Sequence, residues 1–432
     1  MVHPQIASLL YPNRHTDQEY MSVRDRNPRV LVLDGDSQAS LGVARSLGDR
    51  GIDISTGTST PRSLCGSSRH VDHSIVFPDA AAHPADFADA LHDELESGRY
   101  QAVIPTRDDT TTVVSRNKQR LSDTGTRVGV EDWDRFQLAA DKERTFDLAA
   151  TLDVPIPDTI APRTLAEVEA NAPDLPYPVV VKSRSKHVED PSGTLVTQEV
   201  DDTQYAHTPE QLVETFRRLQ ADHDSLRENP PIVQEYVPGQ TTTTVGVARN
   251  GTLLAQFQER RLRTTPASGG NSTLIRGFRD DRLAAYATEV VAALEWTGPI
   301  QVEFMRTPAD EYRLIEVNGR YWGSTPLAIA SGVDIPAIHY AVLLGQEPRT
   351  PETYRDDVVQ QRLLYGDLKW LHEQLEAGNR WAVVPFVEAL VTADQVFVSV
   401  DDPGPTLQAV LQAGELAVSR GGRSIRRAIL GD

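Results

Sequence analysis

Short apolar runs alternate with helix-like segments over the first third of the chain. Residues 29–34 (Arg-Val-Leu-Val-Leu-Asp) form an apolar run that ends at Gly35, which is typical of a buried parallel strand. The elements expected after it are a helix at 40–49, a strand at 52–55, a helix around 85–97 and a strand at 102–106. This alternation predicts an open α/β sheet.

The pattern changes from about residue 136. A helix is expected to begin at Asp141-Lys142-Glu143. Residues 177–182 form an apolar stretch typical of a strand, and residues 232–239 form another that is stopped by Pro238-Gly239. Lys182 is therefore expected at the end of a strand, where its side chain can face a cleft.

A hairpin is predicted late in the chain. Residues 301–305 and 313–320 both read as strands, because they alternate and are rich in β-branched and aromatic residues, and a turn at 307–310 separates them. With the turn centred on Ala309 and Asp310, Glu303 lies directly opposite Glu316. Opposed residues point to the same face, with Cβ atoms about 4.5–5.5 Å apart.

Two further polar residues join this face. Asn318 and Arg320 follow Glu316 by two and four positions. Directly opposed carboxylates destabilise a bare sheet, and they become tolerable if a divalent cation lies between them. Magnesium suits these residues because it takes oxygen ligands and keeps phosphate oxygens in its shell. The alternative is a solvated hairpin face with incidental charges.

The loop after the first strand carries no dinucleotide fingerprint. Residues 35–42 (Gly-Asp-Ser-Gln-Ala-Ser-Leu-Gly) depart from G-x-G-x-x-G, so NAD is not predicted. Ligands of open α/β sheets bind at the carboxyl ends of the strands. The polar residues expected there are Asp36, Ser37, Thr106, Arg107 and Asp108. They could hold an acid substrate, or they could only cap helices.

Composition excludes several classes of protein. The net charge of −19 and the pI near 5.0 argue against a nucleic-acid-binding surface. A single cysteine, Cys65, excludes an intramolecular disulfide framework and fits a reducing cytoplasm, which is the expected location. No run of 18 apolar residues occurs, so no transmembrane helix and no membrane partner are expected. Residues 1–27 lack a signal-peptide core and are predicted to form a disordered arm.

Lysine is scarce among the basic residues. Only five of the 43 are lysine, namely Lys118, Lys142, Lys182, Lys186 and Lys369. A strongly acidic, lysine-poor chain is typical of a halophilic protein, in which salt screens the self-repulsion. A lysine that survives this bias can be one whose compact ammonium is needed, and the candidates are Lys142, Lys182 and Lys186. Chance is the alternative explanation.

Together these motifs resemble the ATP-grasp superfamily. The motifs are Asp141-Lys142, Pro178 to Lys182, Gln234 to Gly239, Glu303 and Glu316 to Arg320. The resemblance covers residues 136–345 and implies a two-lobed α+β domain, with a small lobe at 136–237 and a metal and substrate lobe at 238–345. It also implies that residues 28–135 form a Rossmann-like preceding domain. The motifs are similar to those of carboxylate–amine ligases and of single carbamoyl-phosphate-synthase-type units.

The resemblance implies a role for each motif. ATP and Mg²⁺, with Mn²⁺ as a substitute, would be the cofactors. The implied ATP contacts are the phosphate lysines Lys142 and Lys182 and the adenine hinge Gln234, Glu235 and Val237. The implied metal ligands are Glu303, Glu316 and Asn318. Arg320 would stabilise charge on the transferring phosphoryl group.

Three stretches depart from the family pattern or add to it. The flap after Lys182, residues 183–193, has a single glycine, and four threonines at 241–244 stand where an acidic ribose contact is often seen. Residues 258–273 hold several arginines ahead of a Gly-Gly turn. Arginine suits carboxylate recognition, and Arg263 is our candidate because alternation places it on the face of Arg261. The alternative is a solvated strand and turn.

The sequence thus predicts an ATP-dependent ligase. It would activate a carboxylate as an acyl phosphate and join it to an amine, so its partners are small-molecule acid and amine substrates. A bicarbonate-activating enzyme and a non-catalytic ATP-binding module are the alternatives. Residues 346–432 are expected to form a small C-terminal α/β region, with helices at 367–376 and 405–412 and a strand at 396–400. That region could close the sheet, form a homodimer contact or cover the site, and its arginines at 420–427 form a basic tail.

Overall fold

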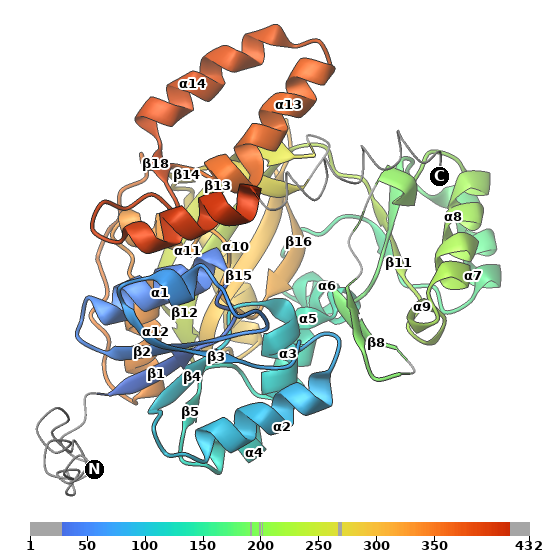
Figure 1. Cartoon of the computed structure of the whole chain (residues 1–432). Coiled ribbons are helices and arrows are strands. Elements are labelled where there is room, and N and C mark those ends of the chain that lie inside the picture. Colours follow the sequence, from blue (N-terminus) through green and yellow to red (C-terminus); the bar gives the residue numbers. More distant parts are fainter. Residues whose placement is uncertain (1–27, 191, 198–199, 201, 267–269, 415–432) are drawn as a thin grey trace, which may run out of the picture.

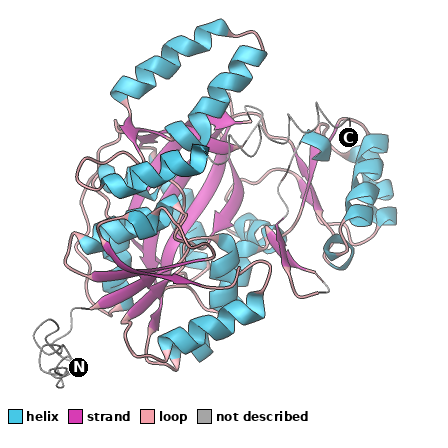
Figure 2. Ribbon diagram, in the orientation of Figure 1, coloured by secondary structure: helices cyan, strands magenta, loops and turns pink. Residues whose placement is uncertain are grey.

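The computed structural model describes residues 28–190, 192–197, 200, 202–266 and 270–414. The predicted N-terminal arm and the basic C-terminal tail lie outside these residues, as does the Gly-Gly turn except for Gly270. Within the described residues there are four sheets: an N-terminal sheet of five strands, a small-lobe sheet of four, a large sheet of seven and a flap hairpin of two. Figures 1 and 2 show the N-terminal and large sheets packed together, with the small lobe set to one side.

The N-terminal sheet is parallel and has the strand order β3-β2-β1-β4-β5. Its strands are β1 (Arg29–Val32), β2 (Asp53–Thr58), β3 (Val71–Val76), β4 (Ala102–Ile104) and β5 (Arg127–Val128). Its helices are α1 (Gln38–Gly48), η1 (Cys65–Ser67), α2 (Pro84–Leu95), α3 (Asp108–Arg116) and α4 (Lys118–Ser122). The predicted open α/β sheet is confirmed. β3 was not predicted, because three of its six residues are polar and four of the six are exposed.

The small lobe is an antiparallel sheet with the order β10-β7-β11-β6, covered by helices that pack through Leu212 and Phe216. Its strands are β6 (Thr159–Ile160), β7 (Val179–Lys182), β10 (Tyr205–Ala206) and β11 (Ile232–Glu235). Its helical segments are α7 (Leu165–Asn171), η2 (Ala172–Asp174), η3 (Asp202–Gln204), α8 (Pro209–Asp222) and α9 (Ser225–Glu228). The flap hairpin is β8 (His187–Glu189) with β9 (Leu195–Thr197).

The large sheet has the order β16-β15-β12-β13-β14-β17-β18. Its strands are β12 (Gln240–Arg249), β13 (Thr252–Thr265), β14 (Asn271–Phe278), β15 (Gly298–Arg306), β16 (Tyr312–Asn318), β17 (Val359–Gln361) and β18 (Asp394–Gln395). Its helical segments are α5 (Trp133–Ala140), α6 (Lys142–Thr151), α10 (Asp281–Ala293), α11 (Thr325–Ala330), α12 (Ile335–Leu343), η4 (Leu363–Asp367), α13 (Leu368–Glu376), η5 (Arg380–Ala382) and α14 (Val383–Thr392). Residues 403–414 are also helical.

The two faces of the large sheet bury different cores. Val302 and Phe304 belong to the core that α5, α6 and α10 complete. Val245 and Phe257 lie on the opposite face and pack against α1, α11 and α12. Further along this second face, Thr243 of β12 is paired with Glu259 of β13 on one side and with Glu303 of β15 on the other. This end of the face is therefore polar. That polar end is where the candidate site lies.

Two predicted boundaries shift in the structure. Residues 136–157 were expected in the small lobe, but α5 and α6 pack on the large sheet because Phe136 and Phe146 insert into its core. The C-terminal region was expected to begin at residue 346, and closing the sheet was one of its possible roles. β17 and β18 do extend the large sheet, whereas the predicted strand at 396–400 is absent from these described residues because the pairing with β17 stops at Gln395. Helices were predicted correctly at 367–376 and 405–412.

A buried histidine at the contact between domains predicts acid sensitivity. His339 of α12 is 1% exposed, its Nδ1 lies 2.9 Å from the Tyr321 hydroxyl, and burial lowers its pKa to about 3. The unfolded chain binds this proton near pH 6.5, so the histidine's contribution to stability is lost as the pH falls from 6.5 toward 3. Between pH 7 and pH 5 we expect the free energy of unfolding to fall by about 2 kcal/mol more in the wild type than in His339→Gln.

Denaturant titrations at the two pH values measure this difference. His372→Gln is the matched control, because the His372 side chain is 70% exposed. Equal pH dependence in the wild type and His339→Gln would show that another group causes the acid sensitivity.

Candidate functional site

The hairpin of β15 and β16 brings the two predicted acids together. Glu303 is paired directly with Glu316, as the sequence predicted. The route to this register differs from the prediction, because the turn is one residue tighter and Arg306 pairs with Tyr312. A bulge between the Glu303 and Phe304 pairs, with Ile315 as the extra residue, restores the register.

Glu316 is held as a carboxylate. Asn318 donates from Nδ2 to Glu316 Oε1 at 2.9 Å, and Lys142 Nζ lies 3.7 Å from Glu316 Oε2. Burial opposes ionisation, but the ammonium groups of Lys142 and Lys186 outweigh it and lower the pKa of Glu316 to about 2. An ionised carboxylate beside an amide oxygen is a donor set that suits Mg²⁺.

Glu303 lies deeper, with 7% of the residue exposed. Burial raises the pKa of Glu303, the guanidinium of Arg261 opposes that rise through an ion pair, and the facing Glu316 adds to it. A cation bound between the two carboxylates would relieve this repulsion. Glu303, which the sequence assigned only to a metal, therefore also forms an ion pair with Arg261.

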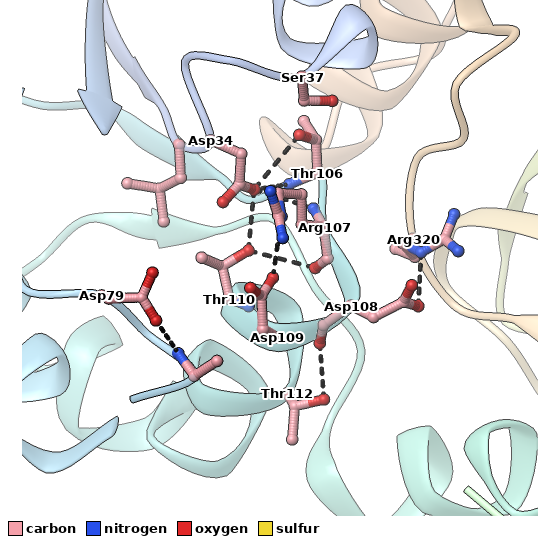
Figure 3. A network of polar contacts seen from close by, with 12 residues as sticks. Asp34, Ser37, Asp79, Thr106, Arg107, Asp108, Asp109, Thr110, Thr112 and Arg320 are labelled. Atoms are coloured by element: carbon pink, nitrogen blue, oxygen red, sulfur yellow. Dashed lines mark hydrogen bonds and ion pairs between the residues drawn. The ribbon is translucent and has the colours of Figure 1, made fainter. Parts of the chain in front are cut away.

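Arg320 joins the large sheet to the N-terminal domain. Its Nε donates to Asp108 Oδ1 at the start of α3, and its Nη1 donates to the Tyr321 carbonyl at 2.7 Å. Lys186 of the flap lies 3.3 Å from the second oxygen of Asp108. Burial would raise the pKa of Asp108, but Arg320 and Lys186 hold it well below its ordinary value. Figure 3 shows Asp108 pointing away from the N-terminal network toward Arg320.

The other polar residues at the N-terminal strand ends mostly hold the backbone. Asp34 Oδ2 accepts hydrogen bonds from the amides of Thr106 and Arg107 at 2.7 and 2.9 Å. Ser37 caps α1, and Asp36 accepts from the amide of Leu64. Of the alternatives left by the sequence, capping therefore holds for Ser37, whereas Asp108 faces the site.

The two predicted phosphate lysines come from different layers. Lys182, at the end of β7, donates to Gln234 Oε1 at 2.8 Å. Burial, with the nearby Lys142, lowers the pKa of Lys182 to about 8. Lys142 is the first residue of α6, where Asp141 caps the helix and the Lys142 amide donates to the Arg184 carbonyl at 2.9 Å. Both ammonium groups thus approach the cleft from fixed backbone positions.

Three cavities surround this constellation. The hinge cavity, of about 380 Å³, is lined by Lys182, Gln234, Glu235, Val237, Thr241, Met305, Ile315 and Trp370, among others. The flap cavity, of about 300 Å³, is lined by Lys142, Lys186, Glu316 and Asn318, among others. The interdomain cavity, of about 240 Å³, is lined by Ser37, Thr106, Arg107, Asp108, Asp109, Lys186, His187, Arg320, Tyr321 and Gly323. The predicted hinge residues therefore line one cavity and the predicted lysines two.

The flap rests on the N-terminal domain. The Leu195 amide of β9 donates to the Ala81 carbonyl at 2.8 Å, and the Leu195 side chain joins the N-terminal core. Glu189 of β8 pairs with Arg116 of α3. Lys186 and His187 thereby line the interdomain cavity. The single glycine of the flap, Gly193, has φ +86° and lies at the turn between β8 and β9.

Arg263 lies away from the acids of the hairpin. Its Nη1 donates to Asp367 Oδ2 at 2.7 Å, its Nη2 donates to the Pro385 carbonyl at 2.6 Å, and its Cζ lies 4.3 Å from the centroid of the Trp370 ring. Two irregularities in the pairing of β13 with β14 flank Arg263, so strict alternation with Arg261 is lost. Arg261 instead reaches Glu303.

Two residues near the acids, the half-buried Arg362 and the buried Glu259, escaped sequence reasoning. Arg362 follows β17, has no hydrogen-bond partner for its Nε among the described residues, and has a pKa lowered to about 10 by burial and by Arg261. Glu259 accepts from the Ser324 hydroxyl, leaves Oε2 without a described partner, and has a pKa raised to about 7 by burial. The signal that could have revealed Glu259 is the pairing of β12 with its two neighbouring strands, because that pairing aligns Glu259, Thr243 and Glu303 in one row.

Comparison with known proteins gives this arrangement a class. A family model described as "ATP-grasp in the biosynthetic pathway with Ter operon" matches residues 227–363. None of the curated proteins matches the sequence. Among the described residues, no helix is long and apolar enough to cross a membrane.

Solved structures resemble the chain over most of its length. A biotin carboxylase–β,γ-ATP complex from Campylobacter jejuni superposes with a TM-score of 0.61 at 14% identity, over 76% of this chain and 74% of that one. N5-carboxyaminoimidazole synthetase from Staphylococcus aureus gives 0.58 at 14%, over 81% and 86%. An L-amino acid ligase from Bacillus licheniformis gives 0.55 at 14%, over 75% of each chain.

The chain therefore has the ATP-grasp fold, and the resemblance to this superfamily predicted from the sequence is confirmed. The preceding α/β domain and the antiparallel sheets of the grasp agree with that fold class. At 14% identity the solved structures show the fold alone, and the reaction depends on the residues of the site.

Proposed function

We propose that this protein is an ATP-dependent ligase that activates a carboxylate as an acyl phosphate and transfers the acyl group to an amine. The observation that carries the proposal is the set Glu303, Glu316, Asn318 and Arg320, gathered on one face beside Lys142 and Lys182. A binding module gains nothing from paired carboxylates and an arginine at the same point, whereas phosphoryl transfer needs both.

ATP fits across two of the cavities. Adenine would occupy the hinge cavity, where Ile315 and Met305 supply apolar walls beside the backbone of Glu235 and Val237. Its phosphates would then run toward Lys182 and Lys142. Glu316, Asn318 and Glu303 would hold Mg²⁺, with Mn²⁺ as a substitute, and the ion would neutralise charge on the phosphate oxygens. In the proposed ribose region, Thr241 lines the hinge cavity while Thr242 to Thr244 are buried within β12.

The chain's own residues then have defined tasks. The acid oxygen attacks the γ-phosphorus, the bond from that phosphorus to the bridging oxygen of ADP breaks, and Arg320 stabilises the charge that develops. The amine then attacks the acyl carbon and expels inorganic phosphate, losing its proton as the amide bond forms. The chain contributes mainly positioning and electrostatics.

The acid would lie beside Arg261 and Arg362. Arg362 is half-buried, its Nε has no partner among the described residues, and it lies near the guanidinium of Arg261, so a carboxylate would satisfy both. The interdomain cavity, with Asp108, Asp109, Lys186 and Arg320, would admit the amine. Bicarbonate is the second candidate for the acid, since it carries the same anionic oxygens.

The test is ADP release with MgATP in molar KCl, because salt screens the net charge of −19. Pools of amino acids, small carboxylic acids and bicarbonate, each with and without an amine, are the substrates. We expect ADP release that depends on the acid. Mass spectrometry of the same reactions should detect the amide product. Arg362→Lys should raise the KM for the acid about tenfold or more and leave the KM for ATP unchanged.

Two outcomes would contradict the proposal. ADP release with bicarbonate alone would favour the bicarbonate-activating reaction. ATP binding by calorimetry with no ADP release from any pool would favour the nucleotide-binding module. Arg355→Lys is the control for the arginine variant, because its side chain is 67% exposed.

A further inference from the structure

The helical hairpin of α13, η5 and α14, residues 368–392, leaves a large apolar surface uncovered. In Figure 1 this arm projects from the body of the molecule above the large sheet. α13 has no buried residue, and α14 buries only Phe386 and Ala389. The large apolar side chains exposed on the arm are Leu368, Leu375, Trp381, Val383, Val384, Val387, Leu390 and Val391, with exposures from 39% to 82%.

The exposure of α14 to water is unfavourable for so apolar a helix. α14 has the sequence Val-Val-Pro-Phe-Val-Glu-Ala-Leu-Val-Thr and carries a single charge, Glu388. A helix that is apolar on all sides is normally buried, and contiguous exposed patches of several hundred Å² mark interaction sites. Trp381, just before α14, and Val391, near the end of α14, are each 82% exposed.

We propose that the arm is the homodimer interface of this protein, formed by packing α13 and α14 against the same helices of a second copy. The exposed apolar side chains offer roughly 700 Å² per chain, close to the roughly 800 Å² per partner of a standard interface. A projecting pair of antiparallel helices can meet its own copy about a two-fold axis, which closes the assembly at two chains.

Charge leaves α14 as the surface through which a second copy can approach. The chain carries a net charge of −19, so two copies repel one another over most of their surfaces. α14 is the exception, because Glu388 is its one ionisable side chain and lies among apolar neighbours. Two copies can therefore approach through the arm, and molar salt both screens the remaining repulsion and leaves apolar contacts in place.

The arm also reaches the hinge cavity. Arg263 donates to the Pro385 carbonyl of α14 and lies against the Trp370 ring of α13, and both Arg263 and Trp370 line the hinge cavity. Thr265 of β13 donates to Glu373 of α13 at 2.8 Å. Dimer formation would therefore hold one wall of the cavity in place. This consequence rests on the proposed ATP site, whereas the interface itself does not.

Sedimentation equilibrium in molar KCl tests the interface without any substrate. We expect a dimer for the full chain, and a dissociation constant at least about 100-fold higher for Val384→Asp/Val391→Asp, because each new carboxylate would have to be buried. Both valines are exposed in one chain, so their replacement leaves its core intact. Val76→Asp is the matched control, since Val76 is 56% exposed on the edge strand β3.

A monomeric wild type, or a double variant that remains dimeric, would overturn the proposal. Calorimetry with MgATP on the same variants tests the link to the hinge cavity. A several-fold weaker affinity in the double variant supports the link. An unchanged affinity in a variant that has become monomeric overturns the link and leaves the interface established.

Discussion

Replacing Glu316 by Gln is expected to lower kcat by roughly 10²–10⁴-fold. The change removes one anionic ligand from the proposed metal site, and metal-ion charge stabilisation is worth several kcal/mol. Glu316 suits this role because Lys142 and Lys186 keep it ionised, with a pKa of about 2. Gln has the same shape and can keep a hydrogen bond with Asn318, so the loss is one of charge.

The fold should tolerate this change. Lys142 loses a partner at 3.7 Å, but Glu303 loses a like charge opposite it, so we expect the free energy of unfolding to change by no more than about 1 kcal/mol. ADP release measures activity, and the rise in Tm caused by Mg²⁺ and ATP measures the site independently. Both should be lost in Glu316→Gln.

Glu311→Gln is the matched control for this experiment. Glu311 lies at the turn of the same hairpin and its side chain pairs with the half-buried Arg313 at 2.9 Å. We expect wild-type activity from it. Normal turnover and a normal Mg²⁺ response in Glu316→Gln would remove Glu316 from the metal site.

Replacing Arg320 by Lys is expected to lower kcat by roughly 10²–10³-fold, with little change in the KM for ATP. A lysine keeps the positive charge but lacks the planar fork with which Arg320 contacts Asp108, the Tyr321 carbonyl and Asn318 together. The proposed role is in the transition state, so the loss should appear in kcat.

Arg313→Lys serves as the control, because Arg313 lies on β16, the strand that precedes Arg320, and pairs with Glu311 rather than with the site. Circular dichroism and the Tm verify that Arg320→Lys remains folded. A raised KM for ATP at unchanged kcat would instead make Arg320 a ground-state contact to the nucleotide.

The elements nearest the site were predictable because their signals are local. Asp141 caps α6 and places Lys142 at its first position, as the sequence indicated. The strand that ends at Lys182 and the hairpin that pairs Glu303 with Glu316 are also local patterns, readable from alternation and turn residues. Irregularities were less predictable, since the bulge at Ile315 left no mark in the alternation.

Arg263 shows where alternation fails. Strand alternation places Arg263 on the same face as Arg261. Irregularities in the strand pairing on both sides of Arg263 change the direction of its side chain, which pairs with Asp367 of η4. Asp367 lies about a hundred residues further along the chain, beyond the reach of any local pattern. The same applies to Arg362, whose burial beside Arg261 depends on β17 joining the large sheet.

The sequence by itself determined the types of residue in the site, the strands and helix ends that carry them, and the face of the hairpin on which the acids meet. These properties follow from periodicity and capping, which act over a few residues. Only the tertiary structure decided the long-range contacts. It pairs Asp108 with Arg320 across 212 residues and packs α5 and α6 on the large sheet, and it leaves the arm exposed to solvent. The reason is physical, because such contacts are selected by how whole layers bury their apolar faces, and no short stretch of sequence contains that information.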